Sequence, residues 1–144
     1  MKQAVTVLRS LPVLIALAAV GGILSVLIPY LLLQGYAGPH KYSAPLFPLL
    51  RNAWEGLHPI FSGVFVLVIG GALAFARPKK WLVLGSSTIL LFPLAALLEM
   101  LRDPSSHNLW PIEFMFYIVL IGGPGLLGAF IGSIIGSIQK KQAI

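Results

Sequence analysis

The stretch from residue 59 to residue 98 reads PIFSGVFVLVIGGALAFARPKKWLVLGSSTILLFPLAALL. Its only charged residues, Arg77, Lys79 and Lys80, lie in the middle, between two apolar runs of 18 residues each. A helix rises about 1.5 Å per residue, so each run reaches roughly 27 Å, close to the ~30 Å thickness of a membrane's hydrocarbon core. The stretch therefore predicts two membrane-spanning helices, which the short basic link makes antiparallel neighbours.

Two further uncharged runs, residues 11–33 and 114–138, are 23 and 25 residues long. The whole chain of 144 residues is 58% hydrophobic and 10% charged, with a mean hydropathy of +0.93. A soluble domain carries roughly 25% charged residues, so these charges are too few to solvate a globular surface. Only helices and closed barrels satisfy the backbone in lipid, and the runs do not alternate as barrel strands do. The sequence predicts an all-α integral membrane protein, a single domain (1–144) with four transmembrane helices.

Composition also excludes several classes of function. Cysteine is absent, which rules out a disulfide, a thiolate metal site and thiol redox chemistry. The net charge of +6 does not indicate nucleic acid as a partner, because the basic residues flank apolar runs and are explained as topology signals.

Basic residues are distributed unevenly between the two predicted faces. With the N-terminus inside, seven lie on the inner face (Lys2, Arg9, Arg77, Lys79, Lys80, Lys140 and Lys141) and three on the outer face (Lys41, Arg51 and Arg102). The positive-inside rule then predicts that both termini are cytoplasmic, and we expect a multi-pass protein of a bacterial cytoplasmic (inner) membrane. Every acidic residue and histidine falls on the opposite, outer side: Glu55, Glu99, Asp103, Glu113, His40, His58 and His107.

The first outer loop contains a predicted amphipathic helix at about residues 46–58. Its apolar side comprises Leu46, Phe47, Leu49, Leu50, Ala53, Trp54 and Leu57, and its polar side comprises Arg51, Asn52, Glu55, Gly56 and His58. We expect this helix to lie in the outer interface, with Trp54 at the depth of the lipid headgroups. Pro59 either starts the next span or kinks a single bent helix.

The last span is rich in glycine. Gly125, Gly128, Gly132 and Gly136 lie close together along it, the last three at intervals of four residues, so one face has no side chains and permits close helix packing. The neighbour on this face is either another helix of the same chain or a partner, which includes a second copy of the protein.

The turn between the third and fourth spans gathers most of the remaining polar residues. In one interpretation it satisfies itself: Arg102 pairs with Glu99, Asn108 caps a helix, and Glu113 complements the dipole of the helix that Pro111 starts. In the other, Glu99, His107 and Glu113 converge with Glu55 or His58 in a pocket whose ligand types would suit Zn, Mn or Fe, although the spacing matches no standard metal motif. The candidate binding residues are Glu55, His58, Glu99, Arg102, Asp103, His107, Asn108 and Glu113.

Three functional hypotheses follow. The leading one is an accessory or structural subunit that packs with partner membrane proteins, based on the glycine face and the lack of a catalytic motif. The second is a small transporter or channel protomer that uses Glu99. The third is a membrane-embedded enzyme acting on a lipophilic substrate at the outer leaflet, with Glu99, His107 and Glu113 as its candidate catalytic residues. No cofactor is indicated, and the identity of any metal stays open.

Overall fold

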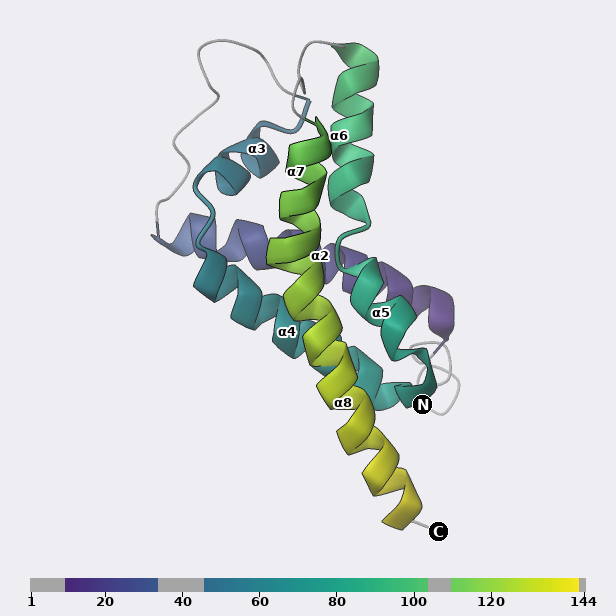
Figure 1. The fold of residues 1–144 in the computed structure, drawn as a ribbon. Coiled ribbons are helices and arrows are strands. Elements are labelled where there is room, and N and C mark those ends of the chain that lie inside the picture. Colours follow the sequence, from purple (N-terminus) through teal and green to yellow (C-terminus); the bar gives the residue numbers. More distant parts are fainter. Residues whose placement is uncertain (1–9, 34–45, 104–109, 143–144) are drawn as a thin grey trace, which may run out of the picture.

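The computed structural model describes residues 10–33, 46–103 and 110–142. Throughout these residues the chain forms helices joined by short turns (Figure 1). Within these described residues, four helical segments are long and apolar enough to cross a membrane: Leu11–Leu33, Pro59–Ala76, Pro78–Arg102 and Pro111–Gln142. The predicted number and order of apolar spans is therefore confirmed.

Two prolines mark the starts of helices in the first half of the chain. The helix α2 (Leu11–Leu33) is followed by the short α3 (Pro48–Glu55) and then by α4 (Pro59–Ala76). Pro48 and Pro59 each occupy a first helical position, where the missing N–H is not needed for an intrahelical hydrogen bond. Because Gly56 to His58 separate α3 from α4, Pro59 starts a new helix and does not kink a continuous one.

The helix α3 is shorter than the predicted segment 46–58, and its polar side was assigned wrongly in part. Asn52, expected on the polar side, is buried next to Ala53, which is fully buried. Trp54 packs against Phe92 and Tyr117 inside the protein, with ring centroids 5.8 and 4.5 Å away. The helix thus forms part of the packed structure, because its apolar residues find protein partners on other helices.

The third span is interrupted, which the sequence analysis did not predict. It consists of a short 3₁₀ turn η1 (Pro78–Lys80), α5 (Trp81–Ser87) and α6 (Leu91–Arg102), and Figure 1 shows that α6 runs in a different direction from α5. Pro93 has no N–H to donate to the carbonyl of Ile89, and that carbonyl instead accepts from the N–H of Phe92 at 3.1 Å. The Thr88 hydroxyl also bonds back to the carbonyl of Gly85 at 2.7 Å, a local bond that competes with regular helix.

The fourth span is helical throughout but changes its winding near the middle. It comprises α7 (Trp110–Tyr117), one π-helical turn η2 (Ile118–Gly122) and α8 (Gly123–Gln142). The wide turn comes directly before Pro124, whose ring leaves the carbonyl of Leu120 without its usual i+4 donor. This span begins at Trp110, four residues before the uncharged run that predicted it.

The helix α8 packs against α4 of the same chain. A Cβ atom added at Gly128 would collide with the backbone of Leu67, and one added at Gly132 would collide with the backbone of Gly71. Both glycines are buried. Of the two neighbours considered for the glycine face, a helix of the same chain or a partner, the structure shows the first, because α4 occupies this face.

The two ends of the molecule differ in chemistry. In Figure 1, α3, α6 and α7 gather at the upper end, whereas η1 and the C-terminal part of α8 lie at the lower end. A buried hydrophobic cluster lies beside α3 and joins it to α2, α4, α6 and the fourth span: Val26, Tyr30, Ala53, Val66, Phe92, Tyr117 and Ile121. This buried cluster holds the helices of the upper end together.

Candidate functional site: an acidic and aromatic pocket

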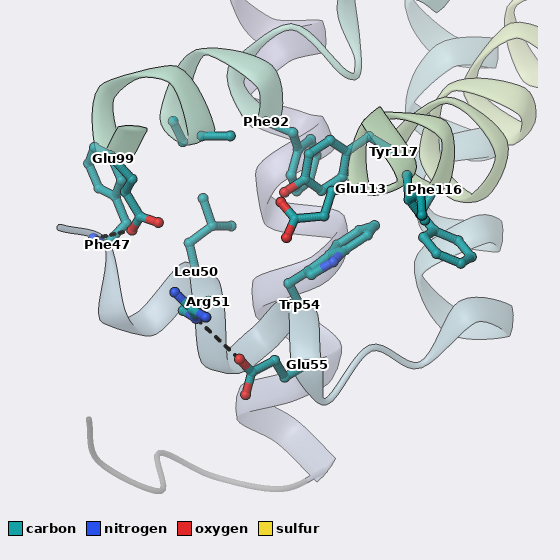
Figure 2. Close-up of a pocket in the computed structure, with 13 residues that line it drawn as sticks. Phe47, Leu50, Arg51, Trp54, Glu55, Phe92, Glu99, Glu113, Phe116 and Tyr117 are labelled. Carbon is teal, nitrogen blue, oxygen red and sulfur yellow. Dashed lines mark hydrogen bonds and ion pairs between the residues drawn. The ribbon is translucent and has the colours of Figure 1, made fainter. Parts of the chain in front are cut away.

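A pocket of about 370 Å³ opens between α3, α6 and α7. Most of its wall is apolar or aromatic, and the charged residues among those that line it are one arginine and three glutamates. The lining residues are Phe47, Leu50, Arg51, Trp54, Glu55, Phe92, Ala95, Ala96, Glu99, Ile112, Glu113, Phe116 and Tyr117. Figure 2 shows the carboxylates of Glu99 and Glu113 directed toward the space between these helices, whereas that of Glu55 turns toward Arg51.

The aromatic part of the wall is a packed cluster. Phe92 of α6 stacks on Tyr117 of α7, with ring centroids 5.2 Å apart and planes inclined by 28°. Trp54 of α3 meets the Tyr117 ring edge-on at 4.5 Å. Aromatic pairs in such arrangements add roughly 0.5–1.5 kcal/mol beyond the area they bury, so these contacts fix the three helices relative to one another.

Glu99 is the most enclosed of the pocket's charged residues. Its residue surface is 7% exposed, and its Oε1 accepts a hydrogen bond of 3.2 Å from the backbone N–H of Phe47, just before α3. The bond joins positions 52 residues apart and satisfies a donor in the first turn of a short helix. Arg102, the partner expected for Glu99, is exposed on the last turn of α6 and does not line the pocket.

The other two carboxylates have different surroundings. Glu55 pairs with Arg51 one turn earlier in α3, with Nε and Oε1 3.2 Å apart and both side chains well exposed. Such an exposed pair contributes at most about 1 kcal/mol to folding, but it neutralises Glu55 locally. Glu113 lies in the first turn of α7 and is half-buried at the pocket wall. Counting the described lining residues, three carboxylates against one guanidinium leave a formal charge of −2.

The structure brings together three of the eight predicted binding residues: Glu55, Glu99 and Glu113. His58 lies at the N-cap position of α4, where its side chain makes no capping hydrogen bond and its ring meets that of Phe61 at 6.3 Å. Asp103 is exposed at the end of α6. His107 and Asn108 lie outside the described residues, and within those residues no three His, Asp or Glu side chains are close enough to hold a metal ion.

Most of the pocket wall could not be predicted from the sequence. Phe92, Phe116 and Tyr117 lie inside apolar spans, where an aromatic residue gives no signal that distinguishes a pocket wall from a lipid-facing surface. Trp54 was assigned to the membrane interface because its helix is amphipathic. Only the concentration of acidic residues near the ends of the outer segments indicated this location.

Comparison with protein-family models, with curated proteins and with solved structures finds no match to this chain. The arrangement of residues in the pocket is therefore the basis for a functional proposal.

Proposed function

We propose that this four-span protein binds a cationic amphiphile in the pocket between α3, α6 and α7. The observation that carries the proposal is the distribution of acidic residues. The chain has four acidic residues and a net charge of +6, yet three of the four line this one pocket. Each comes from a different helix, since Glu55 is in α3, Glu99 in α6 and Glu113 in α7. The three glutamates are therefore brought together by the fold and not by being close in sequence.

The aromatic wall supports a ligand that is both charged and apolar. A cation over the face of a tryptophan or tyrosine gains about 0.5–2 kcal/mol, most where water is excluded. Trp54 and Tyr117 line the pocket together with the carboxylates. The apolar remainder of the wall matches hydrocarbon or aryl groups, which a small hydrated ion lacks.

The rim of the pocket supports entry from the lipid. Ile112 and Phe116 line the pocket and are still 48% and 52% exposed. Both lie on α7 at the outer part of the fourth apolar span. With that span in a bilayer, these side chains contact lipid, so an amphiphile moves from the lipid into the pocket without crossing water.

This proposal develops the second functional hypothesis, in which Glu99 serves a transporter or channel protomer, because binding is the first step of such a cycle. The glycine face no longer favours a partner subunit, since α4 packs on it. Partner subunits remain a prediction that rests on the lack of a catalytic motif in the sequence.

The test uses two probes of the same shape and opposite charge. Tetraphenylphosphonium and tetraphenylborate are titrated into the purified full-length protein in a neutral detergent, and binding is measured by calorimetry. We expect the cation to bind and the anion not to bind. Glu113→Gln should weaken binding of the cation by about tenfold, which corresponds to ~1.4 kcal/mol of binding free energy.

Asp103→Asn is the matched control, because it removes the fourth acidic residue of the chain from a position outside the pocket. Its affinity for tetraphenylphosphonium should equal that of the unmodified protein. Equal binding of the two probes, or equal losses in the Glu113 and Asp103 variants, would show that the cluster of carboxylates does not form a cation site.

A further inference from the structure

A second pocket, of about 440 Å³, lies at the opposite end of the molecule and is strongly basic. We call it the basic cleft. Two segments far apart in sequence form it: the link after α4, with Arg77, Lys79 and Lys80, and the end of α8, with Lys140 and Lys141. Among the described residues that line it are five cations and no carboxylate, which gives these residues a formal charge of +5.

Close packing between α8 and the link brings these charges together. Pro78 is buried, and a Cβ atom added at Gly136 would lie 3.0 Å from its Cγ and 2.5 Å from the carbonyl oxygen of Phe75. Because Gly136 has no side chain, α8 approaches the backbone at the end of α4 and the Pro78 ring of η1 directly. The lysines of the link are thereby held beside the lysines of α8.

Helix dipoles explain only part of this arrangement. Both α4 and α8 end here, and a cation near a helix C-terminus gains about 0.3–1 kcal/mol. Because the five like charges lie close together, they repel one another, and this repulsion destabilises the folded protein at this end. A bound anion removes that repulsion and gives the cleft a ligand of opposite charge.

The surroundings of the cleft identify the kind of anion. Leu82 and Ile138 flank the cleft-lining segments in sequence and are 57% and 51% exposed. Trp81 directly follows Lys80 and meets Phe130 edge-on at 5.4 Å. The cleft thus lies where apolar spans end and basic residues begin, which is the level of phosphate groups in a bilayer.

We propose that the basic cleft binds the phosphate headgroup of an anionic phospholipid, whose acyl chains run along the exposed apolar residues next to it. The binding chemistry is that of a phosphate ester held by ammonium and guanidinium groups. This site is independent of the acidic pocket and does not rest on its proposed function.

Trp81 provides a local reporter. The chain has three tryptophans, so Trp54→Phe and Trp110→Phe together leave Trp81 as the only one. The full-length protein is reconstituted in phosphatidylcholine vesicles that contain either brominated phosphatidylglycerol or brominated phosphatidylcholine. Bromine quenches tryptophan fluorescence on contact, and we expect the anionic lipid to quench Trp81 more strongly at the same content.

The variant Lys140→Gln/Lys141→Gln should reduce the preference for the anionic lipid by roughly tenfold to thirtyfold, given the usual contribution of basic residues near an anionic surface. The control Lys41→Gln/Arg102→Gln removes two of the three basic residues of the predicted outer face and should retain the preference. Quenching by brominated phosphatidylcholine should be the same in both variants, which confirms an intact fold around Trp81.

Two results would overturn the proposal. One is equal quenching by the two brominated lipids in the unmodified protein. The other is an equal loss of preference in the two double variants. The measurement is repeated in inorganic phosphate, with chloride at the same ionic strength as the reference. Retention of the preference in phosphate supports the lipid.

Discussion

At the scale of single residues, Gly132 determines how closely α8 approaches α4. The backbone of Gly71 occupies the space that a side chain at position 132 would need. Backbone atoms of a packed helix do not yield as the end of a flexible side chain does, so even one methyl group forces the helices apart.

Gly132→Ala should lower the free energy of unfolding in detergent by about 1–3 kcal/mol, because overpacking at this contact outweighs the gain in helix propensity. Gly123→Ala in the same helix is the control: a Cβ atom there lies 3.8 Å from the carbonyl oxygen of Ile118, and the residue is exposed. That variant should be neutral or slightly stabilising. Similar stabilities in thermal unfolding of the two variants would contradict the close α4–α8 contact.

The sequence indicated which residues take part in helix packing and in the polar turn, but not which residues they contact. Glycines four apart identify a face without side chains, yet the spacing does not say that Gly71 and Leu67 lie opposite. The polar turn likewise suggested Arg102 as the partner of Glu99, because they are near in sequence. The observed donor, Phe47, is 52 residues away, and nothing in its local sequence indicates this role.

At the scale of elements, α3 belongs to the packed interior of the upper end. Ala53 is fully buried in the hydrophobic cluster, and Leu49, Leu50 and Trp54 pack against that cluster. If α3 only lay on the lipid surface, Ala53 would face acyl chains. Acyl chains are fluid and would make room for a larger side chain at this position.

Ala53→Leu should therefore destabilise the protein by about 1–3 kcal/mol, measured as a lower midpoint of thermal unfolding in detergent. Ala72→Leu is the matched control, since Ala72 is exposed on α4 and a leucine there projects away from the protein. If Ala53→Leu proved as harmless as Ala72→Leu, α3 would lie outside the core.

The number of spans followed from the sequence because length and hydropathy determine it. The irregularities within the spans did not follow. Pro93 and Pro124 were visible inside apolar runs, but a proline is accommodated by a break, a kink or a wide turn according to its neighbours. The chain breaks at Thr88 to Leu90 before Pro93 and forms a π turn before Pro124.

At the scale of the whole molecule, one pocket is acidic and the other basic. The helices α3, α6 and α7, which form the acidic pocket, lie at the opposite end of the molecule from the C-terminal part of α8, which helps to form the basic cleft (Figure 1). The distribution of basic residues predicts that the acidic end faces outward and the basic end faces the cytoplasm. Both proposals depend on this orientation, because it places the carboxylates outside and the lysines on the side where anionic lipids are concentrated.

The orientation is tested most directly by labelling single cysteines, since the chain has none of its own. Asp103→Cys places a thiol at an exposed site on the acidic end, and Ser137→Cys places one at an exposed site in the basic cleft. In intact cells, a membrane-impermeant maleimide should label position 103 and not 137, and position 137 should react only after the membrane is permeabilised. Labelling of both positions from outside, or of position 137 alone, would contradict the account.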